Sequence, residues 1–117
     1  MASTRDRGHS AERIARYYLE DRGLRFRAAN VAARRGEIDL VMDDGGVLVF
    51  VEVRMRGRSR WGGGAESVTT TKQRRLIHAA QHYLQRTGLD RPCRFDVVAL
   101  EGDGAIEWIA DAFQAPP

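Results

Sequence analysis

The pattern of apolar and polar residues between residues 36 and 54 is the clearest indication of secondary structure in the chain. One β-strand is predicted over residues 36–41, and a second is predicted over residues 47–54. The residues between them, Asp43-Asp44-Gly45-Gly46, have the composition of a tight hairpin turn. The second strand is apolar on both faces up to Glu52, which is typical of a central strand covered on both sides. The pattern therefore predicts a chain organised around a buried β-hairpin.

Two helices are predicted where apolar residues recur at helical spacing. The first begins near Ser10, a residue suited to an N-cap, and ends at residues 21–23. The second runs from about Thr71 to Arg86 and ends at Gly88. Further strands are predicted over residues 24–29, 94–100 and 105–109, with residues 30–35 as a connection. This order predicts an α/β fold in which helices pack on the faces of a sheet.

The length of 117 residues suits one domain. We expect a disordered N-terminus over residues 1–7, a single domain over residues 8–112 and a loose tail over residues 113–117. The sequence has no apolar run of transmembrane length and no signal-peptide core. Its single cysteine, Cys93, argues against an internal disulfide or a cysteine-rich zinc cluster, so a cytoplasmic setting without membrane contact is expected.

The basic residues are almost all arginine, with Lys72 as the one lysine, and the formal net charge is +3. Arginine binds phosphate well, so this composition favours an anionic partner, although a solvated arginine-rich surface is an equal alternative. Arg56, Arg58 and Arg60 follow the second strand of the hairpin and lead to Trp61. Such a loop can hold phosphates and stack a base, so these four residues are candidates for nucleic-acid binding. The alternative is a plain solvated loop.

An acidic residue inside an apolar strand needs a physical explanation. Burying Glu52 would cost several kcal/mol unless the carboxylate is paired or bound to a cation. Asp39 on the neighbouring strand and Arg54 on the same face would complete a compact acidic site beside a positive charge. Such a carboxylate pair suits Mg²⁺ or Mn²⁺, with the carbonyl of Val53 as a further ligand. Glu37, in the same run as Asp39, is another candidate site residue.

Residues on the two helices are also candidates for the site. Glu12 lies on the flank of the first helix's apolar stripe, where either the helix dipole or a functional site explains it. Lys72 and Gln73 lie in the first turn of the second helix, from which both could reach over the sheet. His78 and His82 are four residues apart but point away from the apolar face, and we interpret them as surface residues.

The run from Gly36 to Leu40, closely followed by Val49–Val53, resembles the YraN family of small bacterial proteins within the PD-(D/E)XK nuclease-like superfamily. Further matching positions are Gly8, Ala11, Glu12, Tyr18, Leu19, Asn30, Val68, Lys72, Ala79, Ala80, Tyr83, Leu84 and residues 94–97. The resemblance spans roughly residues 8–100. It implies a restriction-endonuclease-like αβββαβ core, with a central mixed sheet flanked by helices, similar to that of Holliday-junction resolvases and restriction endonucleases.

The resemblance also implies roles for individual residues. Asp39 and Glu52 would be metal ligands, and Glu12 would be an outer ligand often reached through water. The family pattern has a water-handling lysine where this chain has Arg54. Arginine stays protonated and cannot act as a base, although it can neutralise charge on a phosphate. Lys72 is therefore a candidate to take over part of the lysine role, with Gln73 helping to orient water.

Three functions follow as hypotheses. The first is a metal-dependent endonuclease that acts on DNA, including branched or structured DNA, with Mg²⁺ or Mn²⁺ as cofactor. The second is a nucleic-acid-binding module of the same fold that cuts weakly. The third is a structural or interaction protein whose acidic residues have no catalytic role. A homodimer is compatible with each of them.

Overall fold

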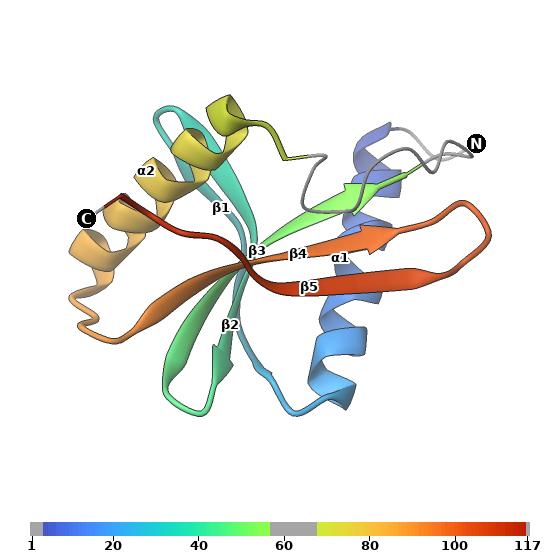
Figure 1. Ribbon diagram of the computed structural model, residues 1–117, viewed down its shortest axis with the longest axis horizontal. Helices are drawn as coiled ribbons and strands as arrows, with labels where there is room; N and C mark the ends of the chain where they lie inside the picture. The colour runs from blue at the N-terminus through green and yellow to red at the C-terminus, as the bar shows by residue number, and fades with distance from the viewer. Residues whose placement is uncertain (1–3, 57–67, 117) are drawn as a thin grey trace.

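The computed structural model describes residues 4–56 and 68–116 (Figure 1). Its elements, in chain order, are α1 (Thr4–Asp21), β1 (Arg25–Ala33), β2 (Gly36–Asp44), β3 (Val47–Met55), α2 (Thr70–Thr87), β4 (Cys93–Leu100) and β5 (Ile106–Phe113). The predicted αβββαβ order is confirmed, and one further strand, β5, follows it.

The sheet has five strands in the order β1-β2-β3-β4-β5. Neighbouring strands run antiparallel except β3 and β4, which are parallel and are connected through α2. Figure 1 shows α1 and α2 on opposite sides of the twisted sheet. The predicted central mixed sheet flanked by helices is therefore confirmed, and β3 is its middle strand.

The core lies on both faces of the sheet. On the α2 face, the ring of Phe50 packs edge-on against Tyr83 with the centroids 6.0 Å apart. On the α1 face, Leu19 packs with Val49 and Val51 of β3. Almost no surface is exposed on Leu19 of α1 or on Val49, Phe50 and Val51 of β3. Burial on both faces explains why β3 reads as a nearly continuous apolar run.

The β2–β3 hairpin has the predicted turn. Gly45 and Gly46 are its two linking residues, with φ angles of 60° and 97°. Glycine adopts such angles without steric cost, and two successive positive φ values match the twist of a β-hairpin. Asp43 accepts a hydrogen bond from the Gly46 amide at 2.9 Å, which holds the turn closed.

Several element boundaries differ from the sequence prediction. Strand β2 extends to Asp44 instead of residue 41, and β5 extends to Phe113 instead of residue 109. Residues 30–33, predicted as a connection, belong to β1, because Val31 pairs with Ile38 and Ala33 pairs with Gly36. Helix α1 begins at Thr4 instead of near Ser10. The local residue pattern of β1 is weak over residues 30–33, and pairing with β2 sets its extent.

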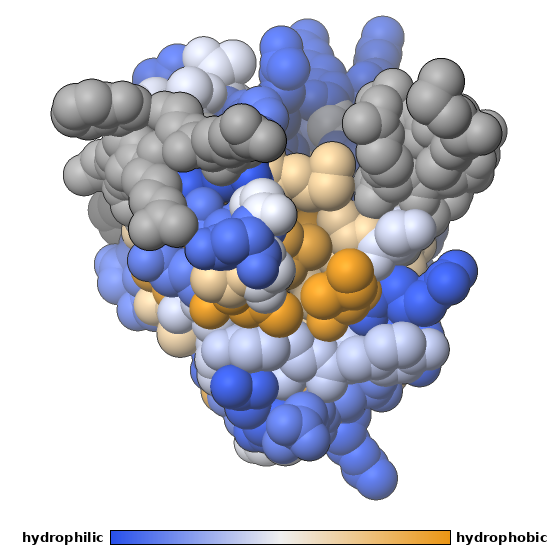
Figure 2. Space-filling model, turned by 90° about the vertical axis from the view of Figure 1, so that its right-hand side faces the viewer, coloured by the Kyte–Doolittle hydropathy of each residue, from blue (hydrophilic) through white to orange (hydrophobic). Residues whose placement is uncertain are grey.

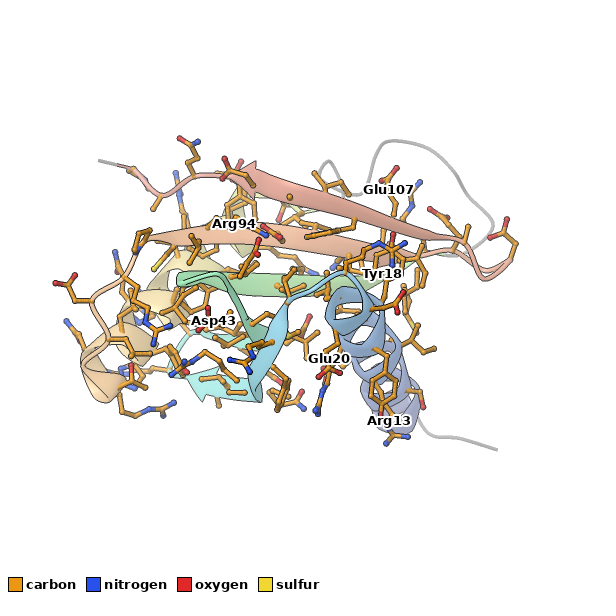
Figure 3. All side chains as sticks on the ribbon, turned by 90° about the horizontal axis from the view of Figure 1, so that it is seen from below. Arg13, Tyr18, Glu20, Asp43, Arg94 and Glu107 are labelled. Atoms are coloured by element: carbon orange, nitrogen blue, oxygen red, sulfur yellow. The ribbon has the colours of Figure 1, made fainter. Side chains whose placement is uncertain are left out.

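Several acidic residues serve the fold at the end of the sheet away from α1, where Figure 3 labels Asp43 and Arg94. Asp96 is fully buried and accepts hydrogen bonds from the Trp108 indole and the Asp111 amide, each at 2.9 Å. Arg94 Nε donates to Asp96 at 3.0 Å. These contacts satisfy a buried carboxylate completely, so Asp96 is a structural acid.

The face in Figure 2 is largely hydrophilic, with a small apolar area near its centre. Among the described residues, the large hydrophobic side chains that are at least half exposed are Ile14, Tyr17 and Met55. No helix in the described part of the chain is long and apolar enough to cross a membrane.

Candidate metal and catalytic site

The candidate site lies at the open end of the β2–β3 pairing. The paired residues closest to this end are Leu40 and Val51, and the next residues along the two strands are Asp39 and Glu52. The Val53 amide donates a hydrogen bond of 2.8 Å to Asp39 Oδ2. The Asp39 carboxylate therefore accepts the hydrogen bond that a backbone carbonyl would accept in a continued strand pair. Asp39 and Glu52 lie close together, as the sequence predicted.

Asp39 and Glu52 lie close enough for the charge of Asp39 to act on Glu52. Two carboxylates at short range repel each other when both are ionised. Burial raises the pKa of both groups, and burial together with the charge of Asp39 raises the pKa of Glu52 to about 7. The positive charges of Lys72 and Arg54 act in the opposite direction on the Glu52 pKa. A bound cation would remove the repulsion within this pair.

A third and a fourth carboxylate lie beside the pair. One oxygen from each of Glu12, Glu37 and Asp39 lies within 4.8 Å of the other two. Glu12 comes from α1, and Glu37 comes from β2, two residues before Asp39. Glu52 lies outside this group of three but beside Asp39, whose charge raises its pKa. Hard oxygen donors brought together from α1, β2 and β3 form a donor set that suits Mg²⁺ or Mn²⁺.

The structure changes the interpretation of Glu12. Because α1 begins at Thr4, Glu12 lies about 12 Å along the helix from its first residue, at about 1.5 Å per residue. The helix dipole acts mainly within the first turn, so it does not explain an acid at this position. The proximity of Glu12 to Glu37 and Asp39 is the better explanation.

Two cations face the carboxylates. Arg54 Nη1 lies 3.7 Å from Glu52 Oε1, and the Glu52 side chain is only 13% exposed. Lys72 lines a pocket of about 180 Å³ together with Glu37 and Glu52. The pocket therefore contains the one lysine of the chain, as its position in the second helix predicted.

A close backbone contact holds Lys72 over the sheet. Gly36 lies so near α2 that an added Cβ would be 2.8 Å from the carbonyl oxygen of Arg75. Thr69 caps α2, and its hydroxyl accepts a hydrogen bond from the Lys72 amide at 3.2 Å. Sequence reasoning missed this function of Gly36, because a close approach between a hairpin and a distant helix leaves no local pattern.

Other predicted site residues have different partners. The Gln73 side-chain amide donates to the Val68 carbonyl at 3.1 Å, which fixes the segment before α2. The Arg56 side chain is 13% exposed, and its Nε lies 3.4 Å from Glu101 Oε1. Arg56 therefore has a structural ion pair, unlike an arginine of a solvated loop. Arg58, Arg60 and Trp61 lie outside the described residues.

Comparison with known proteins identifies the family. The family described as "Uncharacterised protein family UPF0102" matches residues 11–100. The chain is 52% identical to a UPF0102 protein of Nitrosococcus oceani over 118 residues, which covers 97% of this chain and 95% of that protein. It is 54% identical to a UPF0102 protein of Burkholderia ambifaria, with 97% and 80% covered. A UPF0102 protein of Nitrosomonas eutropha is 48% identical, with 97% of each chain covered. The chain therefore belongs to the UPF0102 family, the YraN family that its sequence resembles.

Proposed function

We propose that the protein is a metal-dependent endonuclease that acts on DNA, including branched or structured DNA. The observation that carries this proposal is the convergence of Glu12, Glu37, Asp39 and Glu52, with Lys72 at the same pocket. Clustered carboxylates beside a cation are the groups that metal-assisted phosphodiester hydrolysis requires. Buried acids with strongly raised pKa values also mark functional sites more often than structural ones.

The donor set fits a divalent cation. Asp39, Glu52 and Glu12 would hold it, with Glu37 and the carbonyl of Val53 as further candidate ligands. When bound, such an ion lowers the pKa of a coordinated water and stabilises negative charge on a phosphate. A bound cation would relieve the repulsion from Asp39 that, together with burial, raises the pKa of Glu52 to about 7.

The two basic residues differ in what they can do. Arg54 is always protonated, so it can neutralise charge on a phosphate but cannot accept a proton. Lys72 lines the pocket that contains Glu37 and Glu52, and its flexible stem can bring three N–H donors to a water or a phosphate there. We assign the water-handling role to Lys72 and an electrostatic role to Arg54.

A nucleic-acid-binding module that cuts weakly is the second candidate function. The observation that favours it is Arg54, which occupies the position where the family pattern has a lysine. A protein whose acids are only structural is the third candidate. It is less well supported, because the acids that stabilise the fold, Asp43 and Asp96, are fully paired elsewhere.

A cleavage screen separates these functions. Duplex, single-stranded, flap and four-way-junction DNA would be incubated with the protein in Mg²⁺, Mn²⁺ or EDTA. We expect metal-dependent cleavage that falls by about 100-fold or more in Glu52→Gln and Lys72→Met, the usual effect of losing a positioned catalytic group. Arg54→Lys should retain or raise cleavage. Glu20→Gln is the control, since Glu20 pairs with Arg16 on the α1 surface.

The outcomes are distinct. Salt-dependent DNA binding without cleavage would support the binding module. Cleavage created only by Arg54→Lys would identify a degenerate nuclease. Wild-type rates in Lys72→Met would contradict the role assigned to Lys72, and wild-type rates in Glu52→Gln would contradict the proposed function.

A further inference from the structure

A second pocket adjoins the carboxylate site, between the β1–β2 turn and the first turns of α2. Its volume is about 550 Å³, and it is lined by Arg34, Arg35, Thr71, Arg74, Arg75 and His78. We refer to this pocket as the arginine groove. Figure 1 shows the β1–β2 hairpin beside the N-terminal half of α2, where the groove lies. His78 is exposed, as the sequence predicted.

The four arginines of the groove are exposed, and their charges are not paired with an acidic side chain of the described residues. Within residues 4–56 and 68–116, none of their guanidinium groups forms an ion pair or a side-chain hydrogen bond. Two arginines at the start of β4 are paired instead: Arg91 lies 2.6 Å from Asp43, and Arg94 lies 2.8 Å from Asp44. Like charges that share a groove repel one another, and a bound polyanion would remove that repulsion.

The β1–β2 turn and helix α2 form the two walls of the groove. Arg34 and Arg35 form the two-residue turn between β1 and β2, and Arg74 and Arg75 follow in the capped first turns of α2. The contact between Gly36 and the Arg75 backbone joins the two walls. The guanidinium groups are therefore presented from two rigid elements, an arrangement that suits bidentate contacts to phosphate.

The arginine groove and the carboxylate pocket share two residues. Arg35 and Arg75 line both, and the carboxylate pocket also contains Glu37, Glu52 and Lys72. A phosphate chain bound along the arginines would therefore continue directly to the carboxylates. A small anion would need only one or two of these cations, whereas a chain of phosphates uses all four.

We propose that the arginine groove binds successive phosphates of a nucleic-acid backbone and delivers the next phosphate to the carboxylate site. The choice of nucleic acid as the polyanion rests on the proposed function, but binding in the groove does not require cleavage. This assigns backbone binding to the β1–β2 turn and α2.

The test compares two double variants that change the net charge equally. Arg34→Gln/Arg74→Gln removes two groove arginines, and Arg25→Gln/Arg86→Gln removes exposed arginines from the far ends of β1 and α2. Binding of a fluorescent DNA duplex would be measured by anisotropy in EDTA at several NaCl concentrations. We expect the slope of log K against log salt to become shallower by about 1.8 in the groove variant, at about 0.9 per phosphate contact. The control variant should keep the wild-type slope.

Thermal unfolding would first verify that both variants fold. Equal slopes in the groove variant and the control, or no DNA binding by the wild type, would overturn the proposal. So would a groove variant that loses binding to phosphatidylserine vesicles but keeps its DNA affinity, since the groove would then serve a lipid surface. The binding assay contains EDTA, which prevents metal-dependent cleavage. Its result therefore tests the groove separately from the cleavage screen, whichever way that screen turns out.

Discussion

At the residue scale, the Asp39–Glu52 pair links the site to the stability of the fold. The Val53 amide donates a hydrogen bond to Asp39, and the charge of Asp39 acts on the neighbouring Glu52. Glu52 has an ordinary pKa of 4.5 that burial and Asp39 raise to about 7, so the folded protein binds a proton on Glu52 more tightly than the unfolded chain does. The free energy of unfolding contributed by the pair is therefore greatest at low pH, and it falls as the pH rises between these two values.

We predict that Glu52→Gln removes much of this fall, because glutamine cannot ionise. The difference in pH dependence between wild type and variant should be on the order of 2–3 kcal/mol, because folding raises the pKa of Glu52 from 4.5 to about 7. Urea unfolding in EDTA between about pH 5 and about pH 8 measures it. Glu20→Gln on the α1 surface should follow the wild type. A variant with the same pH dependence as the wild type would show that Glu52 is not destabilised when ionised.

Single residues could be predicted from sequence where they break a local pattern. Asp39 and Glu52 interrupt apolar strands, so their proximity followed from the hairpin register. The proximity of Glu12 to Glu37 depends on how α1 packs on the sheet, which no local pattern specifies. The ion pair between Arg56 and Glu101 likewise depends on the parallel pairing of β3 and β4.

At the element scale, the position of α2 decides whether Lys72 can act in the site. The β1–β2 hairpin approaches α2 so closely that only glycine fits at position 36, where an added Cβ would be 3.2 Å from the Cβ of Arg75. This contact joins the hairpin, which contributes Glu37 and Asp39, to the helix, which contributes Lys72.

We predict that Gly36→Ala lowers the free energy of unfolding by about 1–3 kcal/mol, the usual cost of overpacking, and that Gly36→Val lowers it further. The reason is steric, because the nearest atom is a backbone oxygen that cannot move aside. Chemical denaturation of the three proteins tests the order. Strand propensity alone would give the reverse order, since valine favours strands and glycine does not. A Gly36→Val protein as stable as the wild type would contradict the close contact.

Most elements could be predicted from sequence because their signals are local. The β2–β3 turn has its glycines, and α2 has Thr69 and Gly88 as caps. The extent of β1 could not be predicted in the same way. Residues 30–33 contain Asn30, which has a φ of 52°, and they become a strand only by pairing with β2.

At the scale of the whole molecule, the central sheet brings together acids that are far apart in the chain. Glu12 on α1 lies beside Asp39 on β2, and Asp39 lies beside Glu52 on β3, because β3 is in the middle of the sheet and α1 covers one face. The opposite face carries α2, which brings Lys72 and the arginine groove beside the same strand ends. The central claim is that this convergence forms a divalent-metal site.

Calorimetric titration of Mn²⁺ into the metal-free protein tests this claim most directly. We predict saturable binding that weakens by about tenfold or more in Asp39→Asn and in Glu52→Gln, because each change removes a charged ligand. Glu20→Gln should bind as the wild type does, since Glu20 pairs with Arg16 away from the cluster. Wild-type Mn²⁺ affinity in both Asp39→Asn and Glu52→Gln would contradict the account.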